Sequence, residues 1–211
     1  MTEKQILTDD EQALFKQVAE VCGLELATPD HYLTDDGPSP DILKELKESG
    51  VEALGIYDPD TGDVTLYIVK CAQMSKKLNA SPRDIELIVL AHEWAHMIQH
   101  QGKGKHPDAP VAWEDYPRLW QYSGTDEEDL AQKAAYMALH GFADGKALQR
   151  TMVLMANYQP TPYKQFRKAF ASWLANGVPP DAAVNDLQNT MRLVRDAGNG
   201  PTPTKIENFD E

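Results

Sequence analysis

The chain has 211 residues, of which 42% are hydrophobic and 25% are charged, as is ordinary for a globular domain with a sizeable core. Its formal net charge of −13 disfavours binding to a phosphate backbone, so we expect no nucleic-acid partner. No stretch approaches the roughly 18 apolar residues that span a bilayer, and residues 1–10 lack the pattern of a signal peptide, so we expect no membrane partner.

The first part of the chain predicts a helix, a loop and a shorter helix. Thr8 has the sequence context of a capping box, apolar residues follow at helical spacing and Gly23 suits the C-terminal cap. These signals predict a helix over residues 9–22. Clusters of Asp, Pro and Gly predict a loop over 27–40. A proline in the first-turn position then predicts a short helix over 40–50.

A β-hairpin and a long helix are predicted next. Residues 51–57 and 64–69 contain β-branched and aromatic residues and flank a dense cluster of turn formers, which is typical of a hairpin. A short helix is expected to follow, to about Leu78. Ser81 and the proline after it then form a helix start, and the helix is expected to run to about Gln101.

The remainder of the chain is predicted to be mostly helical. Residues 102–125 hold several Pro and Gly breakers and predict a long irregular connection, a kind of segment that is often functional. A helical stretch is expected over 126–156, with further helices over 161–176 and 181–197. Residues 200–211 are polar and contain proline, and they predict a disordered tail. The expected fold class is α+β, with a small antiparallel sheet beside a mostly helical body.

The segment His92-Glu93-Trp94-Ala95-His96 lies within the predicted long helix. Its spacing places His92 and His96 on one face, a turn apart, so both imidazoles can bind one tetrahedral metal ion, and we expect Zn²⁺. Glu93 lies about 100° around the helix from His92. That position suits a base that takes a proton from a water at the metal better than it suits a third ligand. The alternative is a polar cluster satisfied by hydrogen bonds alone.

A catalytic zinc site needs a third protein ligand from another element. An acidic run at 126–129 opens the next predicted helix. We favour Glu128, because Ala131 and Ala135 would let this helix pack closely against the motif helix. Glu127 is the alternative, and the run also complements the helix dipole.

The other histidines are less suited to the metal. His100 extends the spacing of the pair, but it lies about 12 Å along the helix axis from His92, so only a bend in the helix would bring it to the same ion. His106 falls in the predicted connection and is expected to be solvated. His140 lies about three turns beyond Glu128 and is expected to be structural.

With a glutamate on a following helix, this His-Glu motif resembles the gluzincin branch of zinc metallopeptidases, loosely the small bacterial ImmA/IrrE type. The resemblance runs from about Leu54 to Ala135 and includes the hairpin before the motif. It implies a metallopeptidase core at 54–135. We expect this core to belong to a single zincin-like domain over residues 1–199, whose C-terminal helices at 157–199 lie outside the resemblance.

The resemblance also implies a function, namely hydrolysis of a peptide bond in a protein or peptide substrate. Zn²⁺ would be held by His92, His96 and Glu128, and Glu93 would be the general base. In that family the edge strand of the hairpin pairs with an extended peptide. The corresponding segment here contains the substrate-binding candidates Val64, Leu66 and Ile68. Family members also stabilise the oxyanion with a Tyr or His, for which the candidates are Tyr116, Tyr136 and His140.

Two other functions remain open. One is a non-catalytic or regulatory zinc-binding module on a zincin scaffold, because a fold alone does not imply activity. The other is a zinc hydrolase of a non-peptide amide. The intact Glu93 favours an enzyme over a binding module. Cys22 and Cys71 are expected to be buried thiols in a reducing compartment, which predicts a cytoplasmic protein, and no pattern predicts an oligomeric state.

Overall fold

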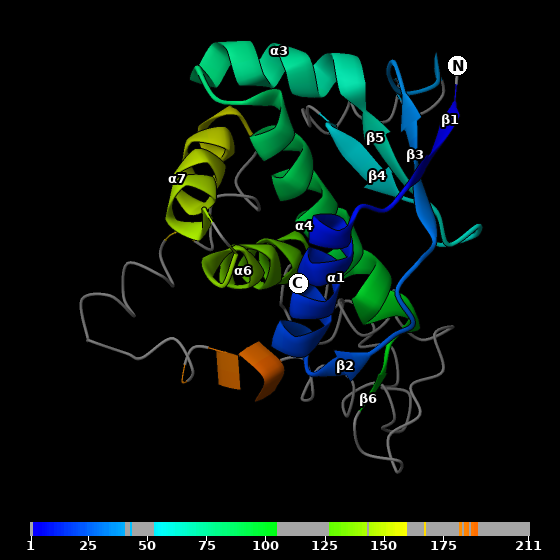
Figure 1. Ribbon diagram of the computed structural model, residues 1–211, viewed down its shortest axis with the longest axis vertical. Helices are drawn as coiled ribbons and strands as arrows, with labels where there is room; N and C mark the ends of the chain where they lie inside the picture. Colours follow the sequence, from blue (N-terminus) through cyan, green and yellow to red (C-terminus); the bar gives the residue numbers. More distant parts are fainter. Residues whose placement is uncertain are drawn as a thin grey trace, which may run out of the picture.

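The structure is a computed structural model, which describes residues 2–40, 43, 53–104, 127–142, 144–159, 167, 182, 184–185 and 187–189. Within these residues a four-stranded sheet lies to one side and helices form the larger part of the molecule (Figure 1). Helix α4 (Pro82–Gln101) runs between the sheet and the other helices. The predicted α+β class is confirmed.

The strands of the sheet follow the order β1 (Glu3–Ile6), β3 (His31–Asp35), β5 (Val64–Tyr67) and β4 (Gly55–Tyr57). The pairs β1–β3 and β5–β4 are antiparallel, but β3 and β5 are parallel. The prediction of an antiparallel sheet is therefore wrong in this respect, and the sheet is mixed. A parallel pair needs a long connection between its strands, and the chain between β3 and β5 supplies one that contains β4.

Two strands of the four-stranded sheet lie where the sequence did not predict them. β3 falls within residues 27–40, which were predicted to be a loop, and β1 precedes the first helix. The turn-forming residues flank β3 rather than interrupt it, because Tyr32 and Thr34 are buried and alternate with partly exposed neighbours. Such short strands are stabilised by the strands beside them, so their own sequence is a weak signal.

Helix boundaries match the predictions where the sequence contains caps. Helix α1 (Asp9–Cys22) begins after Thr8 with a reciprocal capping box and ends at Gly23, whose φ of 68° suits glycine. Helix α4 begins after Ser81, whose hydroxyl accepts the backbone N–H of Arg83 at 3.2 Å. Local hydrogen bonds therefore define where these two helices begin.

Further helices are α3 (Ile68–Leu78), α6 (Glu127–His140) and α7 (Gly145–Met155), followed by the 3-10 turn η2 (Ala156–Tyr158). The predicted helical stretch 126–156 is thus divided into separate helices after His140. A small antiparallel sheet joins β2 (Leu24–Glu25) to β6 (Lys103–Gly104). This pairing brings the end of α4 back to the end of α1.

Several predicted segments lie wholly or largely outside the described residues: the short helix at 40–50, the connection at 102–125, the helices at 161–176 and 181–197, and the tail at 200–211. The few described residues of the last helix, at 182, 184–185 and 187–189, are helical. The division of the chain into a domain and a tail stays a prediction.

Helix α4 is the centre of the core, because its residues from 87 to 99 are all buried. The rings of Phe15 on α1 and Trp94 on α4 meet edge to face, with centroids 5.6 Å apart. At the other end of the contact, Arg83 Nη1 lies 2.7 Å from Glu11 Oε1. These two contacts hold α4 against α1 at separate points along its length.

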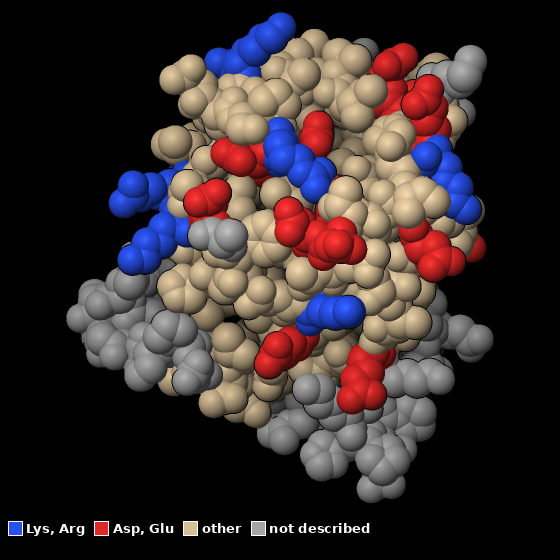
Figure 2. Space-filling model, viewed as in Figure 1, with Lys and Arg blue, Asp and Glu red and all other residues tan. Residues whose placement is uncertain are grey.

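Among the described residues, no helix combines the length and apolar content needed to cross a membrane. On the face seen in Figure 2, the described Lys and Arg side chains are interspersed with Asp and Glu rather than gathered in one patch. That face therefore has the mixed charge of an ordinary protein surface.

Candidate metal centre

The structure brings three of the predicted site residues together. His92 and His96 lie one turn apart on α4, and Glu128 is the second residue of α6. The two Nε2 atoms are 3.2 Å apart, and Glu128 Oε2 lies 3.0 Å from His92 Nε2 and 3.5 Å from His96 Nε2. We call these three residues the donor cluster.

The donor cluster has the chemistry and dimensions of a zinc site. Two imidazole nitrogens and one carboxylate oxygen are a frequent ligand set of catalytic zinc. Ligands at about 2.0–2.2 Å from a tetrahedral ion are about 3.4 Å from one another, and the separations here are 3.0, 3.2 and 3.5 Å. The residues present therefore fit Zn²⁺, and the fourth position of the tetrahedron would belong to a water or substrate.

Small residues on α6 explain how Glu128 reaches the histidines. Ala131, Ala134 and Ala135 are fully buried, and α6 packs on α4 more extensively than on any other described element. Their small side chains let the two backbones approach closely. The same pattern in the sequence favoured Glu128, and the structure brings Glu128 to the histidine pair.

Glu128 is the most exposed member of the donor cluster, although its Oε2 atom is buried. Each histidine side chain is 9% exposed, whereas that of Glu128 is 31% exposed. Burial would raise the pKa of the Glu128 carboxyl, but the neighbouring His96 and His92 outweigh it and hold that pKa well below its ordinary value. The two imidazoles thus favour the charged form of this carboxyl.

Glu93 lies beside the donor cluster, in the contact between α4 and β4. It is buried, and its Cγ is 3.2 Å from the position a Cβ on Gly55 would take. Its carboxylate accepts the backbone N–H of Tyr57. Burial raises the pKa of Glu93 and the nearby Glu128 charge adds to this, against the opposing effects of the two histidines and the Tyr57 N–H.

Gly55 is required for this close approach. A Cβ there would lie 2.7 Å from Val89 Cγ1, which is closer than side chains tolerate, and at a tight 3.1 Å from the carbonyl oxygen of Thr65. Only a residue without a side chain lets β4 come this near to Glu93. This role of Gly55 was not predicted, because nothing in the local sequence distinguishes it from a turn glycine.

The oxyanion candidates do not join the donor cluster in the described structure. Tyr136 and His140 lie eight and twelve residues beyond Glu128 on α6, which is about 12 and 18 Å along the axis. His140 Nδ1 lies 3.4 Å from the amide oxygen of Gln149, in keeping with the predicted structural role. Tyr116 lies outside the described residues, as does His106.

The predicted edge strand is wrong. Val64 and Leu66 are buried on β5, which pairs with β3 on one side and β4 on the other, and Ile68 lies in α3. β5 therefore has no free edge for a peptide. Among the described strands, β4 is the terminal one on this side, and it is the strand next to Glu93.

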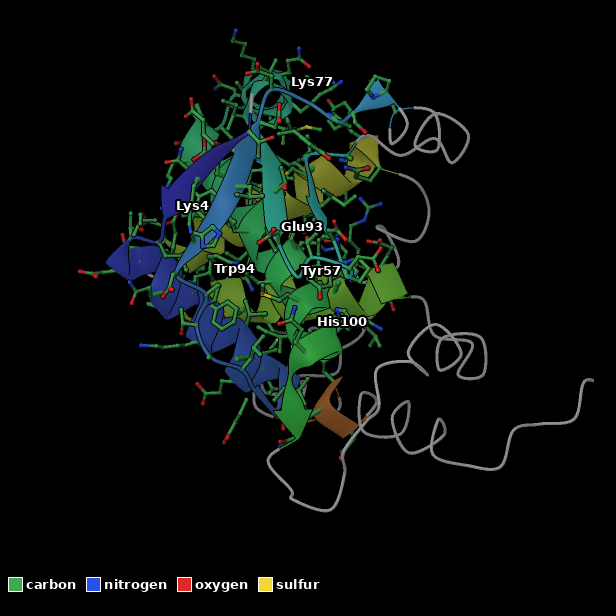
Figure 3. The ribbon with its side chains drawn as sticks, turned by 90° about the vertical axis from the view of Figure 1, so that its right-hand side faces the viewer. Lys4, Tyr57, Lys77, Glu93, Trp94 and His100 are labelled. Carbon is green, nitrogen blue, oxygen red and sulfur yellow. The ribbon has the colours of Figure 1, made fainter. Side chains whose placement is uncertain are left out.

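A second group of polar residues lies near the C-terminal end of α4. The hydroxyl of Tyr57 makes a close contact with His100 Nδ1 and accepts a hydrogen bond from Gln101 Nε2 at 3.1 Å. Glu93, Tyr57 and His100 lie on the same side of α4, whereas Trp94 points away from them (Figure 3). His100 thus contacts Tyr57 of β4 and is not a member of the donor cluster. Spacing along the sequence gives no signal for this contact, since Tyr57 is 43 residues earlier.

Comparisons of this chain with protein-family models, with curated proteins and with solved structures find no match. The functional interpretation therefore depends on the site itself. Its main features are three convergent donor atoms, a buried carboxylate beside them and a terminal strand that contacts that carboxylate.

Proposed function

We propose that the protein is a zinc-dependent hydrolase that cleaves peptide bonds, with His92, His96 and Glu128 as zinc ligands and Glu93 as general base. The observation that carries this proposal is the set of donor separations, 3.0, 3.2 and 3.5 Å, which match a tetrahedral ion. In the sequence, the His-Glu motif is followed by a helix that carries Glu128, as in gluzincins, and this order supports the same assignment.

Each residue has a defined part in the reaction. A bound zinc ion supplies Lewis acidity, which polarises a carbonyl oxygen and makes a water easier to deprotonate. Glu93 accepts a proton from the attacking water and later passes it to the leaving amine, so the carboxylate is regenerated at the end of the cycle. The Tyr57 N–H would hold the Glu93 carboxylate in a fixed direction during both proton transfers.

The position of Glu93 favours an enzyme over a non-catalytic zinc module. A structural zinc site is closed by four protein ligands, whereas the donor cluster comprises three residues within the described part of the chain. A glutamine oxygen could also accept the Tyr57 N–H, so that hydrogen bond alone does not require a carboxylate. Hydrolysis does require one, because proton transfer needs a base.

The substrate class follows from β4. An extended peptide pairs with a free strand edge through backbone hydrogen bonds, and β4 is the terminal described strand beside Glu93. A peptide added there would run past the donor cluster. We therefore propose a peptide rather than a small non-peptide amide, with β4 replacing β5 as the pairing strand.

The test combines metal analysis with one substitution. The purified protein is expected to hold one zinc ion per chain after mild dialysis. Zinc-loaded wild type should cleave members of a mixed peptide library detected by mass spectrometry, and a chelator should abolish the cleavage. Glu93→Gln should lower the rate by about 10²–10⁴-fold, because the amide cannot accept a proton, and should leave the zinc content unchanged.

Two results would contradict the proposal. Substoichiometric zinc after reconstitution would rule out the proposed metal site. Cleavage by Glu93→Gln at the wild-type rate would rule out Glu93 as the general base, even with zinc in place. A wild type that binds zinc but cleaves no peptide would favour the non-catalytic module.

A further inference from the structure

Tyr57 contacts α4 at two places that are seven residues apart. Its backbone N–H donates to the Glu93 carboxylate, and its hydroxyl contacts His100 Nδ1 and the side chain of Gln101. Seven residues correspond to about 10.5 Å along a helix. One residue of β4 therefore connects the proposed base to the last turn of the same helix.

The side-chain half of this contact is well defined. The rings of Tyr57 and His100 meet edge to face, with centroids 5.3 Å apart and planes at 71°. Burial raises the pKa of Tyr57 to about 12, so the hydroxyl keeps its proton. Because the hydroxyl oxygen already accepts from Gln101, we assign its proton to a hydrogen bond with His100 Nδ1.

Gln101 extends the contact to the hairpin turn. Its Nε2 would lie 2.8 Å from a Cβ built on Gly62, so the amide packs directly against that turn. Gly62 has a φ of 79°, and its N–H donates to the carbonyl oxygen of Asp58 at 2.8 Å. The end of α4 therefore supports both Tyr57 and the turn that follows it.

β4 depends on such support because it is short and terminal. It has three residues and pairs only with β5 among the described strands. Short terminal segments with exposed backbone open more easily than the middle of a sheet. A movement of β4 would move the Tyr57 N–H, and with it the direction of the Glu93 carboxylate.

We propose that Tyr57 is a positioning residue, whose side chain, held by His100 and Gln101, keeps its own backbone N–H in place to orient Glu93. This inference rests on the proposed function for the role of Glu93 but not for the contact itself. His100, which the histidine spacing offered as a metal ligand, has the role of anchoring Tyr57.

The first test measures the backbone rather than activity. Amide hydrogen exchange at residue 57 is followed by NMR in zinc-loaded protein, relative to a core amide of α4 such as that of Leu90. Tyr57→Phe keeps the ring and the N–H but removes the hydroxyl, and exchange at residue 57 should become about tenfold faster, the size of one ordinary hydrogen bond. His100→Leu should have the same effect, and the double variant should add little to either.

Tyr32→Phe is the matched control. It removes a hydroxyl that donates to Glu11 at 3.1 Å. Tyr32 lies on β3, which β5 separates from β4 in the sheet. It should leave relative exchange at residue 57 unchanged. Unchanged exchange in Tyr57→Phe, or an equal change in Tyr32→Phe, would overturn the proposal.

The second test uses a peptide cleaved by the wild type. Tyr57→Phe should lower kcat by about 10- to 100-fold, since a misplaced catalytic group has costs of that order. KM and zinc content should stay at the wild-type values. A raised KM with unchanged kcat would mean that Tyr57 binds the peptide instead, which contradicts the positioning role. If the wild type cleaves nothing, the proposed function fails, and the exchange result still decides whether Tyr57 holds β4.

Discussion

Two buried polar clusters lie along α4, and they differ in whether hydrogen-bond donors surround an acceptor or potential metal ligands face one another. Near the start of the helix, Glu11 accepts hydrogen bonds from the Thr8 N–H at 2.7 Å, from Tyr32 at 3.1 Å and from Arg83 at 2.7 Å. We call this the Glu11 cluster. Its carboxylate has a cation and several donors within the chain. In the donor cluster, by contrast, two imidazole nitrogens and a carboxylate oxygen converge on one point.

The contrast separates a structural cluster from a candidate site. Both clusters are buried and both include a carboxylate with a lowered pKa. Burial and a perturbed pKa therefore do not distinguish them. What differs is the kind of atom that converges: donors around an acceptor in the first, and three potential ligand atoms in the second. The first cluster already contains its own cation, Arg83, whereas the ligand atoms of the second are arranged as a metal ion would require.

The largest effect is expected from Glu128→Ala. Loss of a ligand should weaken zinc binding by more than the 10–100-fold that is typical of residues behind the ligands. Glu127→Ala, at the preceding position of α6, is the control and should change the affinity far less. Zinc affinity is measured by competition with a chromophoric chelator. A larger loss in Glu127→Ala would mean that the neighbouring glutamate is the ligand.

A smaller effect on stability is expected from Glu11→Gln. The amide retains one acceptor but loses the charge, so Arg83 or the Thr8 N–H loses its partner, which costs about 2 kcal/mol. Urea unfolding should register this loss, while the zinc affinity stays at the wild-type value. Glu20→Gln, the same substitution at an exposed position of α1, should change little. A comparable loss of zinc affinity in Glu11→Gln would show that the two clusters are coupled.

The smallest effect concerns pH. Burial would raise the pKa of Glu11, but the Thr8 N–H and Arg83 outweigh it and lower that pKa in the folded state. A group with a lowered folded pKa stabilises the fold above its unfolded pKa of about 4.3 and loses that contribution as the pH falls through the folded value. The stability difference between wild type and Glu11→Gln should therefore shrink between about pH 5 and pH 3. A difference that stays constant over this range would contradict the assignment.

Short-range signals in the sequence predicted the helices and the histidine pair. The capping residues Thr8 and Ser81 mark the starts of α1 and α4, and four-residue spacing places His92 and His96 on one face. The small residues of α6 pointed to Glu128. In each case the interacting residues are a few positions apart in the sequence, or the residues that allow close packing share one face of a single helix.

The sheet was harder to predict because strand pairing joins distant residues. β3 pairs with β5, about thirty residues later in the chain, and this pairing decides that β5 is an interior strand. The hairpin pattern alone cannot tell which of its strands faces outward. The contact of Tyr57 with His100 has the same character, since neither residue carries a local signal for the other.

Trp94 has a consequence for the motif around it. Its ring is fully buried against Phe15, and within the described residues its indole N–H has no hydrogen-bond partner, so shape alone holds it. A helix anchored by one large side chain cannot turn about its own axis without displacing that side chain. The rotational setting of α4, and hence the direction in which its histidines point, is therefore fixed from the opposite side by a residue of α1. The alignment of the donor atoms is in this sense a property of two helices packed back to back, and Phe15 belongs to its determinants through its contact with Trp94.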